Sequence, residues 1–215
     1  RGPIIIEAED MDFKSIKSCV TDPFNWYKSV RGHAGNGFAD MGTNPSAALR
    51  HYLKLKDGQT GDYTIFVRYT CASKAGNIKV SVNGTAQTVR CEKTATNEWR
   101  LVSVKAVLKA GQNTLIITNS GALPMYIDQV IYQPDDVPVM TYDVNVRTAT
   151  HGTVTADRTE AAEGDTVTLR IEPAEGYKLK SLRVTNSVYF VFETTIPVPA
   201  GATEVKVVMP HDNTS

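Results

Sequence analysis

Long apolar runs are missing from this sequence of 215 residues. No segment approaches the roughly 18 consecutive apolar residues that indicate a membrane-spanning helix, so we expect no insertion into a membrane. The first residues, Arg1-Gly2-Pro3, also lack the charged, apolar and small-residue regions of a signal peptide. The sequence is therefore typical of a soluble, mature fragment.

An excess of charge of one sign is missing as well. The chain has 23 Lys and Arg residues against 23 Asp and Glu residues, which is a formal net charge of zero. Proteins that bind nucleic acids or anionic membranes carry a basic patch or an excess of Lys and Arg. The charge balance therefore predicts no nucleic-acid partner and no attraction to an anionic membrane.

Cysteine is scarce, with only Cys19, Cys71 and Cys91 in the chain. Three scattered cysteines are too few for a disulfide framework or a zinc site, and at most one bridge can form. Cys71 and Cys91 fall at apolar positions near the ends of predicted strands, which favours buried free thiols. A Cys71–Cys91 disulfide is the alternative.

β-Branched residues, in contrast, are abundant: 23 Val and 24 Thr make up 47 of the 215 residues. Their side chains lose rotamer freedom in helices and pack well on sheets, which predicts an all-β protein. Apolar and polar side chains alternate over residues 62–71, and Asn83-Gly84 is typical of a two-residue hairpin turn. The strands predicted in the first part of the chain span 4–9, 37–41, 47–55, 61–71, 77–83, 86–92, 99–108, 113–119 and 125–132. Their spacing indicates a sandwich or a barrel.

The composition changes at Gln133-Pro-Asp-Asp-Val-Pro138, where two prolines and two acids interrupt the strand patterns. We therefore predict one domain over residues 1–134 and a second, small domain over residues 135–215. In the second domain, Glu160-Ala-Ala-Glu-Gly164 is predicted to form a tight loop. The short strands predicted there span 142–146, 152–155, 165–171, 181–184, 189–194 and 204–208.

Sequence motifs of catalysis are absent. The chain has no nucleophile elbow, phosphate-binding glycine loop, H-E-x-x-H motif or metal-ligand spacing of Cys and His, and its four histidines are far apart. Two facing carboxylates could catalyse glycoside hydrolysis, but many acidic pairs can be nominated without geometry. We therefore expect a non-catalytic chain, with a small hydrolase as a rival interpretation.

Carboxylates form the most informative pattern in the sequence. Glu7 and Glu9 are two residues apart, so in a strand both project from one face, and Asp128 lies in the last strand of the first domain. Clustered carboxylates suit a hard cation such as calcium. The alternative is that all three face solvent on an edge strand, as most charged side chains do.

Several segments together resemble the carbohydrate-binding modules of families 6 and 35. The resemblance covers residue 4 to about residue 134, and its paired ends are its most specific part. It is carried, in order, by Ile6-Glu-Ala-Glu-Asp10, Gly35-Asn-Gly-Phe38, Gly61-Asp-Tyr-Thr-Ile-Phe-Val-Arg-Tyr69, Val82-Asn-Gly84, Trp99, Lys109-Ala-Gly-Gln-Asn-Thr-Leu115 and Ile127-Asp128. It implies a jelly-roll β-sandwich with a structural calcium ion. Carried over residue by residue, the ligands would be Glu7, Glu9, Asp128 and a main-chain carbonyl near Arg31.

The same resemblance implies a sugar site in the loops at one end of the sandwich. Phe38 and Trp99 match the family's aromatic positions, and aromatic rings pack against the C–H-rich faces of sugars. Many family members have Asn where this chain has Tyr126, so we expect Asn119 or Tyr126 to supply the polar contacts. The alternative for Trp99 is packing in the core. Trp26 and Tyr27 are further loop aromatics that could widen the platform, with covering of the core as their alternative role.

The second domain resembles bacterial β-rich repeats of secreted and cell-surface proteins. The matching segments are Tyr142-Asp-Val-Asn-Val146, Gly152-Thr-Val-Thr155, Ala161-Ala-Glu-Gly-Asp-Thr-Val-Thr-Leu169, Pro173-Ala-Glu-Gly-Tyr177 and Met209-Pro210. Such repeats imply a spacer or display role. In the family another strand usually follows the Met-Pro turn, which implies that the chain is cut from a longer protein or lacks one edge strand.

Together these patterns predict a bacterial, secreted or cell-surface protein that binds a poly- or oligosaccharide without cleaving it. The resemblance implies that it targets a linked polysaccharide-degrading domain to a glycan such as plant cell-wall material. The rival from another class is a structural or adhesive surface module that has lost its sugar site, which the Tyr126 departure favours.

Overall fold

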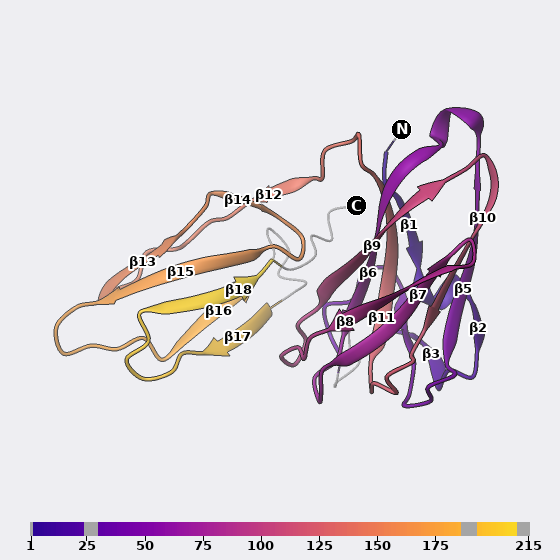
Figure 1. Cartoon of the computed structure of the whole chain (residues 1–215). Coiled ribbons are helices and arrows are strands. Elements are labelled where there is room, and N and C mark those ends of the chain that lie inside the picture. Colours follow the sequence, from indigo (N-terminus) through magenta and orange to yellow (C-terminus); the bar gives the residue numbers. More distant parts are fainter. Residues whose placement is uncertain (1, 24–29, 186–192, 210–215) are drawn as a thin grey trace. The chain divides into compact units, whose positions relative to one another are not determined.

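The computed structural model describes residues 2–23, 30–185 and 193–209, and the chain divides into two compact units. Unit 1 comprises Arg1–Pro138 and unit 2 comprises Val139–Ser215 (Figure 1). The loop aromatics Trp26 and Tyr27, for which we considered widening of the sugar platform or covering of the core, fall outside the described residues.

Unit 1 is a sandwich of two antiparallel sheets, which confirms the predicted all-β jelly-roll class (Figure 1). One sheet has six strands, with β1 paired to β11 beside the order β3-β4-β11-β6-β9: β1 Ile4–Glu7, β3 Ser18–Thr21, β4 Gly37–Asp40, β6 Gly61–Thr70, β9 Arg100–Leu108 and β11 Tyr126–Pro134. The other has five strands in the order β2-β5-β10-β7-β8: β2 Asp12–Lys14, β5 Ala48–Leu55, β7 Gly76–Val82, β8 Thr85–Cys91 and β10 Gly111–Thr118. Two short 3-10 helices complete the unit, η1 over Ala8–Asp10 and η2 over Asp57–Gln59.

The alternation of side chains along the strands places the core between the two sheets. In β6, Tyr63, Ile65, Val67 and Tyr69 are buried in the main core, where they meet residues of the second sheet such as Leu115. The hairpin between β7 and β8 turns at Asn83 and Gly84, whose φ angles of 50° and 86° fit the predicted turn.

Two short strands were not predicted. β2 and β3 are three and four residues long, and their side chains are mostly exposed, so neither has an alternating pattern that the sequence could reveal. The predicted loop at residues 160–164 is also wrong in part, because Glu160–Ala162 forms strand β14 opposite Thr141–Asp143, strand β12.

The described part of unit 2 forms three small antiparallel sheets. Besides β12 and β14, it contains a three-stranded sheet and a hairpin with Leu182 opposite Ile196. The core of the described part is small, with Ala161, Val167 and Leu169 among its buried members. The remaining strands are β13 Gly152–Ala156, β15 Thr166–Pro173, β16 Ser181–Thr185, β17 Glu193–Pro197 and β18 Glu204–Val208.

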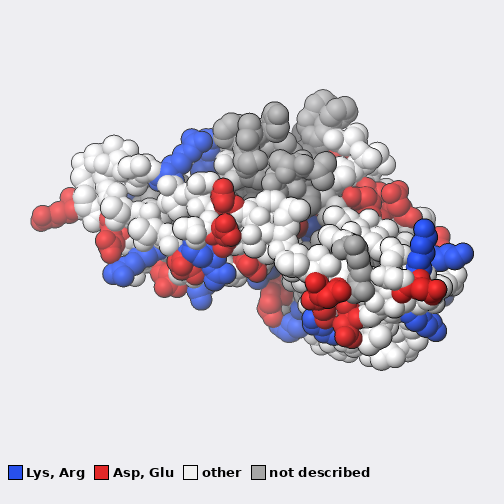
Figure 2. All heavy atoms as spheres, turned by 90° about the horizontal axis from the view of Figure 1, so that it is seen from above, with Lys and Arg blue, Asp and Glu red and all other residues white. Residues whose placement is uncertain are grey.

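The surface agrees with the balanced composition. On the face that Figure 2 shows, acidic and basic side chains occur on both units and neither sign covers a unit by itself. No helix within residues 2–23, 30–185 or 193–209 is long and apolar enough to cross a membrane. Cys19, Cys71 and Cys91 are free thiols, and Cys71 and Cys91 are buried as predicted.

A hydrogen bond joins the two sheets inside the sandwich. His51 lies in β5 of the five-stranded sheet, and its Nδ1 is 2.9 Å from the hydroxyl oxygen of Tyr132 in β11 of the six-stranded sheet. Burial lowers the pKa of His51 below its ordinary value, and the nearby Asp12 carboxylate opposes this shift. The folded protein therefore favours the neutral imidazole.

We expect this histidine to make unit 1 less stable in mild acid. Because the folded pKa is lowered, the unfolded chain takes up the proton first as the pH falls below about 6.5, the ordinary pKa of histidine. His51→Gln removes this titration. The unfolding free energy of the wild type, relative to that of the variant, should therefore fall as the pH is lowered from about 7 to about 5. Urea denaturation at a series of pH values measures it. The control His151→Gln changes a histidine of unit 2 and should leave the pH dependence of unit 1 intact.

The segment between the units generates a second prediction. Val139 is 48% exposed and Met140 is 68% exposed, and neither belongs to a strand. Exposed chain outside a sheet is a preferred site of proteolysis. Brief digestion with thermolysin, which cleaves before apolar residues, should therefore yield a stable fragment that ends near Pro138. Mass spectrometry of the digest checks this, and a digest without any such fragment would contradict two separately folded units.

Candidate functional site

A β-bulge in β11 determines where Asp128 points. Ile127 is paired with Tyr69 of β6 and Gln129 with Arg68, so Asp128 is an extra residue between them. A bulge interrupts the alternation of a strand and redirects its side chains. Ile127 and Val130 both lie in the main core, which leaves Asp128 and Gln129 on the opposite face of the sheet.

Asp128 is fully buried on that face and is held by an ion pair. Its Oδ2 accepts a short hydrogen bond from Nη1 of Arg68, which is itself only 1% exposed. The backbone N–H of Ala34 donates to both carboxylate oxygens, at 3.1 and 3.0 Å. Burial raises the pKa of Asp128, and the Arg68 guanidinium acts against this shift.

The carboxylate of Glu7 lies next to this pair, under the loop of residues 32–37, here called the glycine-rich loop. Glu7 faces Gln129 across the β1–β11 ladder and accepts a hydrogen bond from its amide at 2.8 Å. A Cβ atom on Gly35 would lie 2.6 Å from Cδ of Glu7, and Gly35 has a φ of +52°. Both the left-handed backbone and the close approach therefore require glycine at this position.

Glu9 has a buried carboxylate group whose charge is poorly compensated by its surroundings. Both of its oxygens are buried, and no other described residue donates a hydrogen bond to either of them. Burial raises its pKa to about 7, and the negative charges of Glu7 and Asp128 add to this effect. A proton or a cation would relieve the repulsion.

The three predicted carboxylates thus lie close enough to interact, but their hydrogen-bond partners differ. Asp128 is engaged by Arg68 and Ala34, and the carbonyl of Arg31 accepts the indole N–H of Trp99 at 2.8 Å. Within the described parts of the chain, no three His, Cys, Asp or Glu side chains form a group arranged to hold a metal ion. Within the expected ligand set, Glu9 has two buried carboxylate oxygens that accept no hydrogen bond from another described residue.

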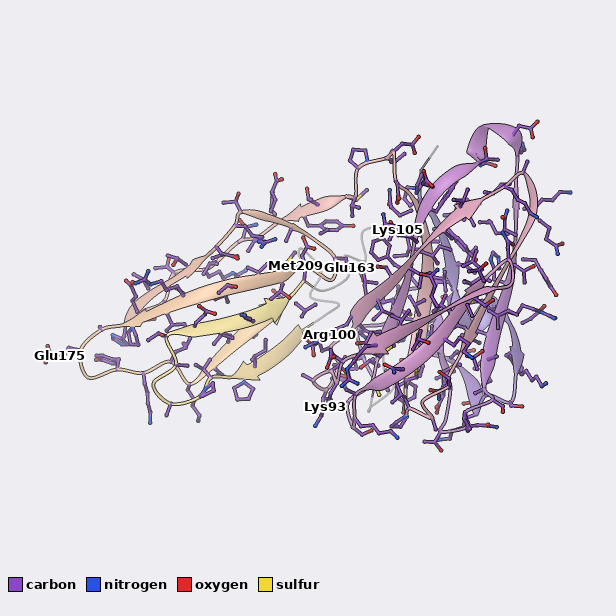
Figure 3. The ribbon with its side chains drawn as sticks, viewed as in Figure 1. Lys93, Arg100, Lys105, Glu163, Glu175 and Met209 are labelled. Atoms are coloured by element: carbon purple, nitrogen blue, oxygen red, sulfur yellow. The ribbon has the colours of Figure 1, made fainter. Side chains whose placement is uncertain are left out.

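The predicted aromatic residues lie together, in a small second core on the outer face of the six-stranded sheet. Phe38 is 6.2 Å from Trp99 and 5.2 Å from Tyr126, measured between ring centroids, and Val30 packs with them. Trp99 directly precedes Arg100, which Figure 3 labels at the start of β9.

Phe38 and Trp99, which the family resemblance placed at the sugar site, are only 0% and 4% exposed. The indole N–H of Trp99 donates to the carbonyl of Arg31 in the loop. The Trp99 ring also covers the guanidinium of Arg68, whose Cζ lies 5.1 Å from the ring centroid. Packing, the alternative that we considered for Trp99, describes both rings. Tyr126 is half-buried and retains an accessible part.

Asn119 is fully buried and faces the loops rather than solvent. Its amide oxygen accepts from the backbone N–H of Leu123 at 2.9 Å, and its amide nitrogen donates to the carbonyls of Leu123 and Gly42, at 2.8 and 3.5 Å. Asn119, which we expected to contact the sugar, therefore links the chain at Gly42 to the chain at Leu123 by hydrogen bonds.

Residues 40–44 and Pro124 help to line a pocket of about 550 Å³ beside Tyr126, at the end of the sandwich where β11 begins. Gly42, with a φ of +61°, donates its N–H to Oδ1 of Asp40 at 2.9 Å, and the backbone N–H of Met41 donates to the carbonyl of Met125 at 3.0 Å. The lining residues are Ser15, Ile16, Lys17, Asp40, Met41, Gly42, Thr43, Asn44, Pro124 and Tyr126.

One ion pair lies in the pocket wall. The Nζ of Lys17 is 3.5 Å from Oδ2 of Asp40, and the Lys17 side chain is 70% exposed whereas that of Asp40 is 10% exposed. The lining thus combines hydroxyl, amide and charged groups with apolar residues such as Ile16 and Pro124.

The sequence analysis missed Arg68, Lys17 and Asp40. Arg68 had a visible signal, because it is a charged residue on the polar side of a strand whose other side is apolar. That pattern normally indicates an exposed residue, and only the loop packed over it shows that it is buried. Lys17 and Asp40 had no signal, since their pairing depends on the contact of β3 with β4: Lys17 directly precedes β3 and Asp40 ends β4.

The repeat domain at the end of the chain has a family match. Residues 142–215 match the family described as the divergent InlB B-repeat domain. No curated protein matches the chain.

Unit 1 is similar to solved carbohydrate-binding modules. A family 35 module from Clostridium thermocellum has a TM-score of 0.52 at 17% identity, covering 61% of this chain and 98% of that module. The family 35 module from Paenibacillus barcinonensis has a TM-score of 0.51 at 20% identity, covering 61% of this chain and 99% of that module. The GH26-CBM35 β-(1,4)-mannanase of Podospora anserina has a TM-score of 0.51 at 23% identity over 67% of this chain. The present chain spans only 30% of that mannanase.

This chain thus covers the two matched modules almost completely, whereas it covers the mannanase only in part. Unit 1 has the jelly-roll fold of family 35 carbohydrate-binding modules, and residues 142–215 are similar to the divergent InlB B-repeat domain.

Proposed function

We propose that unit 1 binds a carbohydrate, without cleaving it, in the pocket beside Tyr126. The observation that carries this proposal is the pocket itself, which has about 550 Å³ and opens at the loop end of a family 35 fold. This volume lies within the range of ligand sites in proteins, about 300–1,000 Å³.

The composition of the pocket suits a sugar. The accessible part of Tyr126 and the neighbouring Pro124 offer apolar surface for a C–H-rich sugar face. Lys17, Asp40 and Asn44 offer charged and amide groups for the hydroxyls, and Asp40 lies directly opposite Tyr126 in the β4–β11 ladder, so polar and apolar groups lie side by side. The phenol of Tyr126 thus takes the position where an amide was expected.

The same lining supports binding rather than hydrolysis. Asp40 is the one carboxylate among the described residues that line this pocket, and it is paired with Lys17. Glycoside hydrolysis usually requires two carboxyl groups that flank the scissile bond. We therefore propose that any cleavage of the glycan is performed by another domain.

The two units together suit a targeting role outside the cell. A binding module raises the local concentration of a linked domain on its glycan, and a β-rich repeat can act as a spacer or display module. The fold of unit 1 and the bacterial repeat in unit 2 fit an extracellular or surface-associated protein. We propose a secreted parent protein that degrades polysaccharide.

Calcium is the second part of the proposal. The buried carboxylate oxygens of Glu9, with Glu7 adjacent, would hold the ion. Calcium prefers carboxylate and carbonyl oxygens and would supply the positive charge that this corner of the fold lacks. Its role would be structural, because the carboxylates belong to the chain segments that meet under the glycine-rich loop.

Sugar binding should depend on Tyr126. An array of glycans identifies the ligand, and Tyr126→Ala should then weaken its binding by about tenfold or more, since burying one large apolar side chain is worth about 1.5–3 kcal/mol. Tyr52→Ala, which removes an exposed ring from the other sheet, is the matched control and should leave affinity unchanged.

Lys17→Met provides a test that does not disturb the aromatic core, because Lys17 is an exposed residue of the pocket wall. Lys17→Met should also weaken glycan binding, as measured by calorimetry. Circular dichroism that matches wild type is the control for correct folding of each variant. A glycan that binds both pocket variants with wild-type affinity would place the site elsewhere.

Calcium should raise the melting temperature of unit 1. Binding to the folded state alone stabilises it by mass action, by about 2.7 kcal/mol at a free concentration of 100 times Kd. Differential scanning calorimetry in calcium and in chelator measures the shift, and Glu9→Gln should abolish most of it. Glu92→Gln, at a carboxylate that is 57% exposed, is the control. Equal melting temperatures in calcium and chelator would refute the calcium site.

A further inference from the structure

The five-stranded sheet carries an excess of positive charge that the neutral composition of the chain conceals. Its five strands contain five Lys and Arg residues and one acidic residue. The six strands of the other sheet, in contrast, contain three Lys and Arg residues and four acidic residues. The cations of the five-stranded sheet are Lys14, Arg50, Lys54, Lys79 and Arg90, and its acid is Asp12.

The alternation of side chains places all six charged groups on the outer face of this sheet. Leu49, Leu53 and Val80 lie in the main core, and the charged residues of the same strands occupy the alternate positions. All five cations are exposed. One layer of the sandwich in Figure 1 thus has a basic outer surface.

Two of these cations are paired with carboxylates. Nη2 of Arg50 lies 3.2 Å from Oδ2 of Asp12, on the neighbouring strand β2. Nε of Arg90 lies 2.9 Å from Oε1 of Glu92, just after β8. Both pairs are exposed to solvent, so each is weak and can exchange its partner for a ligand.

The other three cations, Lys14, Lys54 and Lys79, form no ion pair with any of the described residues. An isolated exposed lysine is ordinary and is solvated. Here, however, the lysines share one face with two arginines and a single acid, although the whole chain has as many acids as cations. Such a face has a positive potential and attracts ligands of the opposite sign.

The strand register determines how far apart the cations lie. Lys54 and Arg50 are on β5, Lys79 is two strands away on β7, and Arg90 is on the next strand, β8. The registers place these four on one diagonal line across the sheet. With strands about 4.8 Å apart and residues about 3.4 Å apart along each strand, neighbouring cations on the line are about 8–14 Å apart. A ligand with one anionic group cannot engage the whole line, whereas an extended polymer with repeated anionic groups can.

Neutral hydrogen-bonding groups fill the outer face between the cations. Hydroxyl and amide side chains both donate and accept, which suits the hydroxyl groups of neutral sugars. Single-stranded nucleic acids instead require aromatic rings on which their bases stack. Of the residues on these five described strands, only Tyr52 places an aromatic ring on this face, and the guanidinium of Arg50 lies over that ring. The neutral groups are Asn77, Ser81, Thr88, Gln112, Thr114 and Thr118.

We propose that the outer face of the five-stranded sheet binds an acidic polysaccharide in which charged sugars alternate with neutral ones. The widely spaced cations pair with the carboxylates of the charged sugars, and the hydroxyl and amide groups between them bind the neutral sugars. This charge complementarity concerns a different sheet from the pocket beside Tyr126, which lies on β11. The site goes beyond the proposed function and requires neither the pocket nor a metal ion.

The three unpaired lysines provide the test. The full 215-residue chain is titrated with hyaluronan, a polymer of alternating glucuronate and N-acetylglucosamine, by calorimetry at several salt concentrations. A triple variant with Lys14→Gln, Lys54→Gln and Lys79→Gln should bind about tenfold more weakly, since each exposed ion pair changes affinity by about 1.5- to 5-fold. The salt dependence of its binding should also be shallower, because fewer counterions are released.

A second triple variant is the matched control. Lys178→Gln, Lys180→Gln and Lys206→Gln change the net charge by the same amount at exposed lysines of unit 2. This variant should keep the wild-type affinity and salt dependence. Circular dichroism and the melting temperature check that both variants are folded.

Two further polymers test the chemistry of the ligand. The methyl ester of hyaluronan lacks the negative charges and should not bind. Polygalacturonate, with a charge on every sugar, and single-stranded DNA should bind more weakly than hyaluronan at equal concentrations of anionic groups. If either binds at least as tightly, the assignment of an alternating polysaccharide is wrong.

The remaining outcomes separate this site from the pocket. Tyr126→Ala should bind hyaluronan as wild type does. If Tyr126→Ala abolishes hyaluronan binding and the Lys14, Lys54 and Lys79 variant retains it, the polymer occupies the pocket, so this inference fails while the proposed function stands. Failure of the folded wild type to bind hyaluronan at low ionic strength would also overturn the inference.

Discussion

The functional end of unit 1 depends on a charge pair that is completely enclosed by protein. Asp128 and Arg68 come from adjacent strands, and removal of either would leave the other as an uncompensated buried charge. Both also bind backbone groups of the glycine-rich loop, through Ala34 and Gly32. The position of this loop, and with it the second aromatic core, therefore follows from one electrostatic constraint.

The aromatic core and the pocket have different roles: the core stabilises this end of the sandwich, and the pocket is the proposed ligand site. Phe38 and Trp99 are packed against the loop and the guanidinium, so they stabilise this end of the sandwich. Tyr126 belongs to both features, because its ring packs edge-on against Phe38 while it also lines the pocket. A half-buried ring with a packed neighbour loses little conformational freedom when a ligand binds, which agrees with the sugar site that we propose.

Local sequence patterns predicted most of the sandwich because alternation and turn chemistry act over a few residues. The long strands β5, β6, β7 and β10 have one apolar side, and Asn83-Gly84 encodes its turn directly. β2 and β3 were missed because three or four mostly exposed residues carry no such pattern. Their pairing is supplied by β5 and β4, which are distant in sequence.

The sequence by itself determined the all-β class and brought forward Glu7, Glu9, Asp128 and Tyr126, because residue types and spacing are local properties. Only the tertiary structure decided what these residues face. The bulge at Asp128 directs its carboxylate to Arg68, and the loop over Trp99 turns an expected platform into a core. Burial and charge pairing arise from segments that meet only after folding, so no local pattern encodes them.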